Sequence, residues 1–157
     1  MRKRIAIVLV LAMIGPSVVL AVGGDRAAYM GGTLTMIKEK SEGEFSTADS
    51  ISVVFTVKKA PPVLIPYASI ESLEYGQKAG RRVAVALLVS PLALFSKKRN
   101  HYLTITYKDA KGADQAAVFE LGKDIVRTSL TVLELRSKKQ IEYQDDEARK
   151  SLGGGEK

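Results

Sequence analysis

Alternating apolar and polar residues predict short β-strands through the middle of the chain. The clearest run is Ile51 to Val57, in which every second residue, starting with Ile51, is apolar. His101 to Lys108 alternates in the same way, and Gln115 to Leu121 follows after the turn residues Asp109 to Gly112. An alternation of period two is typical of a strand with one buried face, and the turn predicts that the last two strands form a hairpin.

Three shorter apolar runs complete the set of predicted strands. Thr33 to Ile37 is the first, Val63 to Pro66 lies after a Pro-Pro turn, and Ile70 to Tyr75 ends at Gly76. Runs of this length that are bounded by Gly and Pro are typical of strands in a small sheet or barrel.

The last regular element has the period of a helix. Asp124 lies at its start, where a negative charge suits the helix dipole, and the element ends near Lys138. Its apolar residues share one arc of the helix surface: Ile125, Val126, Leu130, Val132 and Leu133. The pattern therefore predicts a mainly β fold with one C-terminal helix, followed by a disordered charged and Gly-rich tail over residues 144–157.

Two passages resemble the bacterial pleckstrin-homology-like (PH-like) domains. Residues 63–76, Val-Leu-Ile-Pro-Tyr-Ala-Ser-Ile-Glu-Ser-Leu-Glu-Tyr-Gly, are similar to the third and fourth strands of that family. Residues 97–107, Lys-Lys-Arg-Asn-His-Tyr-Leu-Thr-Ile-Thr-Tyr, are similar to the basic entry to its fifth strand. The resemblance covers roughly Thr33 to Tyr143. It implies a PH-like domain over residues 28–143, with a seven-strand barrel of two packed antiparallel sheets capped by an α-helix.

The resemblance implies little about activity, because this fold carries many binding roles. Animal members often bind inositol lipids through a basic loop between the first two strands. The matching loop here, Lys38 to Glu44, has two bases offset by three acids. We therefore expect no phosphoinositide site in this loop.

The N-terminus has the pattern of an export signal. Three bases at positions 2–4 precede the apolar run Ile5 to Ile14, and a Gly-Pro-Ser break and a second apolar stretch follow. We expect residues 1–21 to be a signal peptide that is cleaved after Ala21; the alternative is an uncleaved anchor to about residue 24. Either way the remaining chain lies in the periplasm or another extracytoplasmic space. A buried helix of a cytosolic protein is disfavoured by the three leading bases.

Composition adds a mild positive charge and excludes thiol chemistry. The 157 residues include 24 Lys and Arg, 17 Asp and Glu, and no Cys. Removing the three leader bases leaves 21 bases and a net charge of +4, which suits an anionic surface. The absence of cysteine excludes a lipoprotein anchor, disulfides, zinc–thiolate sites and cysteine nucleophiles.

The segment most suggestive of function is apolar and flanked by bases. Val83 to Phe95 is too short to span a bilayer. The resemblance makes it an insertion between the fourth and fifth strands of the family. It suits an interfacial hairpin bent at Ser90-Pro91, with the flanking bases at the level of lipid headgroups. The candidate contact residues in the range 81–101 are Arg81, Arg82, Leu87, Leu88, Leu92, Phe95, Lys97, Lys98, Arg99 and His101.

These patterns predict an exported, non-enzymatic binding module of the bacterial envelope. Its partner would be an envelope protein of unknown identity or an anionic lipid surface. One alternative is that residues 83–95 are packed core. Another is a structural protein that assembles into a homo-oligomer with this segment as the interface between subunits.

Catalytic and metal-binding patterns are missing from the sequence. It contains no nucleophile elbow, phosphate loop, zinc-protease helix or calcium loop. Glu71 and Glu74 are not an evident carboxylate pair, and Asp145 to Glu147 belongs to the predicted tail. His101, the single histidine, suits either an anion contact or a structural hydrogen bond, and we favour the latter. We expect no catalytic residue, metal, cofactor or nucleic-acid partner.

Overall fold

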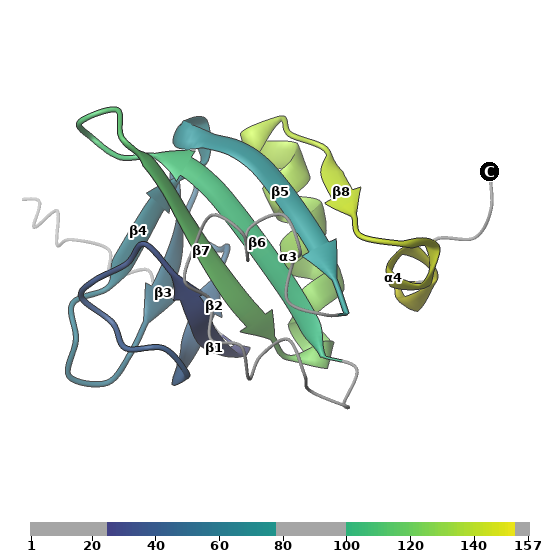
Figure 1. Cartoon of the computed structure of the whole chain (residues 1–157), viewed down its shortest axis with the longest axis horizontal. Coiled ribbons are helices and arrows are strands. Elements are labelled where there is room, and N and C mark those ends of the chain that lie inside the picture. The colour runs from purple at the N-terminus through teal and green to yellow at the C-terminus, as the bar shows by residue number, and fades with distance from the viewer. Residues whose placement is uncertain (1–24, 78–99, 153–157) are drawn as a thin grey trace, which may run out of the picture.

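The computed structural model describes residues 25–77 and 100–152, and these form a sheet with two helices (Figure 1). The strands are β1 (Asp25–Gly32), β2 (Ser41–Ser46), β3 (Ser52–Thr56), β4 (Val63–Pro66), β5 (Ile70–Gly76), β6 (His101–Lys108), β7 (Asp114–Leu121) and β8 (Ile141–Tyr143). The two α-helices are α3 (Lys123–Ser137) and α4 (Asp146–Ser151), and a short 3-10 turn, η1 (Tyr67–Ser69), lies between β4 and β5. The described chain is therefore mainly β, with a helix after the seventh strand, as the sequence predicts.

The strands form one open sheet in the order β4-β3-β2-β1-β7-β6-β5-β8. All neighbouring pairs are antiparallel except β5 and β8, which run parallel. The predicted barrel of two packed sheets is therefore wrong in this respect. The sheet is continuous through the β1–β7 pairing, and its edges at β4 and β8 do not pair with each other.

One face of the sheet and α3 enclose the main core. Alternate residues of the strands point to this face, among them Phe55 of β3 and Leu103 of β6, and both are almost fully buried. Leu130 and Leu133 of α3 belong to the same cluster. Figure 1 shows α3 crossing behind β5 and β6. Its buried apolar residues belong to the same core cluster as those of the strands. The helical period predicted from the sequence is confirmed, with Leu135 exposed on the opposite side.

Arg136 connects the end of α3 to the other half of the sheet. Its guanidinium donates hydrogen bonds to the backbone carbonyls of Thr47, at 2.7 Å, and Asp49. It also lies over the ring of Tyr67, 5.4 Å from the centroid. These contacts join α3 to the β2–β3 loop and to η1, so the helix is held at both halves of the sheet.

The N-terminal strands differ from the sequence prediction. Thr33 to Ile37 is not a strand; β1 lies upstream, at Asp25–Gly32, and β2 occupies most of the predicted Lys38–Glu44 loop. Both faces of β1 carry buried residues, Tyr29 on one and Met30 on the other, so β1 lacks the alternation that identifies a strand. Residues 83–95 consequently lie between the fifth and sixth strands of this chain, not between the fourth and fifth as expected.

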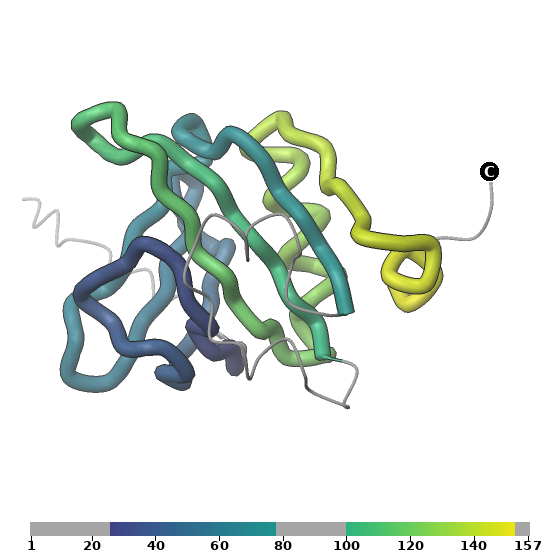
Figure 2. Tube along the Cα trace, in the orientation of Figure 1, coloured from purple at the N-terminus to yellow at the C-terminus, as the bar shows by residue number. Residues whose placement is uncertain are grey.

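The C-terminal part also differs from the prediction. An eighth strand follows α3, and part of the segment expected to be a disordered tail forms α4. Asp145 begins this helix, because its side chain accepts a hydrogen bond from the backbone N–H of Ala148 at 2.7 Å. Figure 2 shows β8 and α4 beyond β5, on the side of the molecule away from β3 and β4. Ile51 is a smaller error: it is 71% exposed, although Val53 and Phe55 are buried as predicted.

Candidate functional site

The candidate site lies at the end of the sheet where β5 and β6 separate. The last paired residues of these antiparallel neighbours are Gly76 and Tyr102. Residues 77–100, here called the connection, join the two strands. A β-hairpin needs a loop of only about two to five residues, and much longer loops are commonly functional. Nine of the ten predicted contact residues belong to the connection and lie outside the described residues; His101 is described.

His101 is held by a hydrogen bond at the start of β6. Its Nδ1 atom lies 2.5 Å from the hydroxyl of Tyr75, a fully buried residue of β5. The two rings are stacked, with centroids 6.0 Å apart and planes 18° from parallel. The prediction of a structural hydrogen bond at this histidine is confirmed. The Tyr75 partner was missed, because nothing in the sequence relates two residues on different strands before their register is known.

Ser151 of α4 extends this contact into a chain of hydrogen bonds. Its hydroxyl lies 3.2 Å from the Tyr75 hydroxyl and donates to the carbonyl of Ala148 at 2.7 Å. Each hydroxyl has one proton to donate. All three contacts are satisfied together when His101 Nδ1–H donates to Tyr75, Tyr75 donates to Ser151, and Ser151 donates to Ala148. This arrangement places the histidine proton on Nδ1 and leaves Nε2 as an acceptor.

The surroundings of His101 favour its neutral form. Burial is the main cause of a lowered pKa at this imidazole, and the positive charge of Lys123 acts in the same direction. The carboxylate of Glu120 opposes both effects, but the pKa still lies below its ordinary value.

Aromatic contacts support the same end of the sheet. The ring of Tyr143 in β8 meets Tyr75 edge-on, with centroids 6.0 Å apart. The guanidinium of Arg149 in α4 lies 5.3 Å from the centroid of Tyr143. β8 and α4 therefore pack against Tyr75 from the side opposite β6. The position of His101 is set by tertiary contacts from β5 and α4 as well as by its own strand.

Charge is divided unequally between the connection and the rest of the chain. Residues 78–99 contain six bases and no acids. The described residues 25–77 and 100–152 contain 14 bases and 16 acids, a net charge of −2. The net positive charge of residues 22–157 therefore comes from the connection, which leaves the sheet beside His101. A basic segment in a chain whose described part is slightly acidic attracts anionic surfaces locally.

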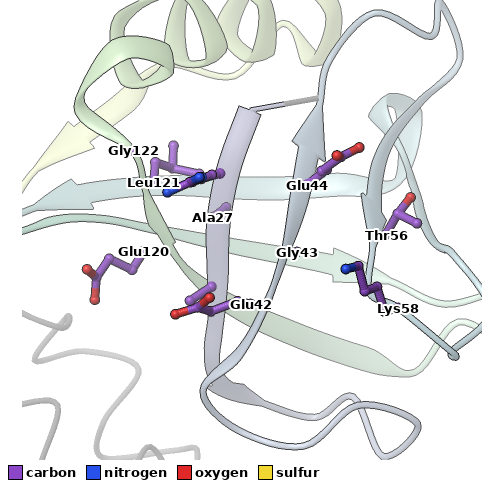
Figure 3. A pocket seen from close by; sticks show the side chains of 11 residues that line it. Ala27, Glu42, Gly43, Glu44, Thr56, Lys58, Glu120, Leu121 and Gly122 are labelled. Atoms are coloured by element: carbon purple, nitrogen blue, oxygen red, sulfur yellow. The ribbon is translucent and has the colours of Figure 1, made fainter. Parts of the chain in front are cut away.

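A groove of about 780 Å³ lies beside this end of the sheet (Figure 3). β1, β2 and β7 form most of it, and its charged residues are Arg26, Glu42, Glu44, Lys58 and Glu120. Figure 3 shows Glu120 and Lys58 at opposite sides of the groove. Four of the five charged residues are exposed and Glu120 is half-buried, so the groove is a hydrated depression in the surface. It borders the candidate site because Leu121, which lines it, pairs with His101.

The described residues provide no cluster of three or more His, Asp or Glu side chains that could hold a metal ion. Glu71 and Glu74 have separate partners: Glu71 lies 3.9 Å from the Lys108 ammonium, and Glu74 accepts a hydrogen bond from Gln144 at 3.2 Å. Asp145, from the acidic cluster of the sequence, is engaged as the cap of α4. What the described part of the site supplies is an imidazole of lowered pKa, next in sequence to the basic connection.

No protein-family model and no curated protein matches this chain. Within the described residues, no helix is long and apolar enough to cross a membrane.

Proposed function

We propose that this protein is an exported, non-enzymatic binding module of the bacterial envelope that docks on an anionic lipid surface through residues 81–101. The observation that carries the proposal is the concentration of positive charge in the connection, beside a domain of net charge −2. The export signal predicted over residues 1–21 would deliver the domain to the outer side of the cytoplasmic membrane.

We also propose a PH-like fold for β1 to β7 and α3, residues 25–137. Support comes from the antiparallel strand order β4-β3-β2-β1-β7-β6-β5 and from the helix that follows β7. In this interpretation β8 and α4 are additions that lie beyond β5. Such a domain is a rigid platform, and a long loop between two of its strands is a position where binding residues commonly occur.

The energetics favour a weak, salt-sensitive contact with lipid. Each base close to an anionic membrane contributes about 1 kcal/mol, so the five flanking bases together contribute up to about 5 kcal/mol. Because ions screen these charges over roughly 10 Å at 0.1 M salt, binding is expected to weaken as salt is added. A protein partner would instead require a defined complementary surface.

Liposome flotation tests the proposal with protein that starts at Val22. The vesicles contain equal parts of phosphatidylglycerol and phosphatidylcholine, and neutral phosphatidylcholine vesicles are the lipid control. The test variant replaces the flanking bases by Gln at Arg81, Arg82, Lys97, Lys98 and Arg99. The matched control makes the same replacement at five exposed lysines of the described domain: Lys38, Lys58, Lys111, Lys139 and Lys150.

The expected result is flotation of the unchanged protein and of the control variant with anionic vesicles only. The test variant should lose at least tenfold in the floated fraction. Equal losses in both variants would assign binding to overall charge and contradict the site. No flotation of the unchanged protein, together with sedimentation as an oligomer without lipid, would favour the scaffold alternative.

A further inference from the structure

A second apolar cluster lies on the sheet face opposite α3. It comprises Met30 of β1, Tyr102 of β6, and Ala116 and Val118 of β7, with Ala28 packed against it. The residues that alternate with these in the same strands belong to the main core. Successive side chains of a strand point to opposite faces, so the cluster occupies the outer face of the sheet. This set of residues is called the outer face below.

The outer face is buried, although its members come only from strands. Tyr102 is 2% exposed, Val118 1% and Ala116 4%, and Thr104 between them is 3% exposed. No residue of α3 or α4 belongs to the cluster. Strands lie side by side and cannot cover the face that their own side chains form. Burial to this degree requires a layer on top of the sheet.

We propose that the apolar segment Val83–Phe95 is this layer and packs on the outer face of β1, β7 and β6. The segment belongs to the connection, which leaves the sheet after Gly76 and returns at Asn100. Gly76 pairs with Tyr102, so both ends of the connection lie next to the largest residue of the outer face. The segment is therefore tethered at the surface that needs covering.

The contact of Asn100, where the connection returns to the sheet, also supports packing on the outer face. Asn100 donates a hydrogen bond to the Tyr102 hydroxyl at 3.4 Å, which brings the last residue of the connection over the outer face. Two polar side chains on this side of the sheet are compatible with an apolar cover. Ser72 and Thr106 hydrogen-bond to each other at 2.6 Å, so both hydroxyls have a partner without the segment.

The N-terminal residues are the competing occupant within the chain. β1 starts at the end of the sheet where the connection leaves it. Ala28 of β1 and Tyr102 of β6 show this, because both pair with Glu120 of β7. Cleavage after Ala21 would leave only Val22 to Gly24 ahead of β1, which is too short to cover three strands. A second copy of the chain is the other competitor, and the experiment below separates all three.

The packing has a consequence for the candidate contact residues. Leu87, Leu88, Leu92 and Phe95 would contact the protein rather than lipid, while the flanking bases stay at the surface. The inference goes beyond the proposed function and does not depend on it. A segment packed on the outer face could equally present its bases to a partner other than lipid.

Disulfide trapping tests the inference, because the natural chain has no cysteine. In protein that starts at Val22, Ala116→Cys is combined in turn with Leu87→Cys, Leu88→Cys, Leu92→Cys and Phe95→Cys. The matched control pairs each segment cysteine with Leu64→Cys, an exposed position of β4. We expect at least one Ala116 pair to form a disulfide within one chain at a rate tenfold above its control.

Thiol labelling of Ala116→Cys alone provides the second measurement. Labelling should be slow in the Val22-start protein and at least tenfold faster when residues 83–95 are replaced by a Gly-Ser stretch of equal length. Disulfides between chains would assign the cover to a second copy. Slow labelling only when residues 1–21 are present would assign it to the N-terminal segment. Either result, or equal trapping at Ala116 and Leu64, would overturn the inference.

Discussion

The Tyr75 hydroxyl and Nδ1 of His101 lie 2.5 Å apart, and this contact joins β5 to β6 where the connection leaves the sheet. Tyr75 is fully buried, and Ser151 of α4 contacts the same hydroxyl. One phenol therefore holds three elements together. The first residue of β6 is fixed in position next to the segment that carries the positive charge.

Replacing Tyr75 by Phe should destabilise the domain by about 1–2 kcal/mol. The ring and its packing remain, but His101 and Ser151 lose a hydrogen-bond partner in a partly buried place. Urea unfolding of the two proteins measures the difference. Tyr143→Phe, which keeps its edge-on contact with Tyr75, is the control and should change stability less. Equal effects would mean that the Tyr75 hydroxyl contributes nothing specific.

Stability should fall as the pH drops below about 6.5, because His101 titrates. Its pKa is lowered in the folded protein, mainly by burial, so the unfolded chain binds the proton first. Above pH 6.5, the pKa of His101 in the unfolded chain, this titration does not lower the free energy of unfolding. The free energy of unfolding then decreases as the pH falls from 6.5 toward the lower pKa of His101 in the folded protein. Urea midpoints between pH 7 and 5 should show this slope in the natural protein. His101→Asn should flatten it, and an unchanged slope would exclude the histidine as its source.

Tyr29→Phe should leave stability unchanged or raise it by up to about 1 kcal/mol. The Tyr29 ring is 1% exposed, and its hydroxyl is buried without a hydrogen-bond partner of normal geometry among the described residues. An unsatisfied buried hydroxyl costs free energy, and phenylalanine removes it while keeping the ring contact with Phe119. Thermal unfolding at pH 7 checks this, and a clear loss of stability would reveal a partner for the hydroxyl.

The same residue should make the fold sensitive to alkali. Burial raises the pKa of Tyr29 from 10.0 to about 12, and the backbone N–H of Leu34 opposes this only partly. Above pH 10 the unfolded chain loses this proton before the folded one does. The resulting loss of stability reaches roughly 2 kcal/mol at pH 12. Urea unfolding from pH 9 to 11.5 measures this effect. The free energy of unfolding of the Tyr29→Phe variant should exceed that of the natural protein by an amount that grows steadily with pH.

Gly32→Ala should destabilise β1 by about 3 kcal/mol or more. Gly32 has φ +137°, and an added Cβ would lie 2.2 Å from the carbonyl oxygen of Ala116, a backbone atom that cannot move aside. Gly112→Ala is the matched control, because φ is also positive there but the space is open. It should cost only about 1 kcal/mol. Circular dichroism during thermal unfolding compares the two, and similar losses would contradict the steric argument.

The strands and the helix that the sequence predicts correctly are those with strong local signals. β6 and β7 alternate and are joined by a turn in which Asp109 accepts hydrogen bonds from the backbone N–H groups of Lys111 and Ala113. α3 has an apolar arc of helical period. β1 lacks such a signal because both of its faces are buried, and α4 is too short to show a period.

The charge of the candidate site is readable in the sequence, but its surroundings are not. The bases around residues 83–95 are visible as a pattern before any fold is known. The Tyr75 partner of His101 lies 26 residues away, and Ser151 lies 76 residues from Tyr75. Contacts at such separations depend on strand register, which only the folded chain defines.

By itself the sequence determined the local elements β3 to β7, the helix α3 and the concentration of bases between β5 and β6, because each follows from spacing or composition over a few neighbouring residues. Only the tertiary structure decided that the sheet is open, that β8 pairs in parallel with β5, and that a second face of the sheet is buried. These features arise from packing between distant segments, and their free energy appears only when those segments meet.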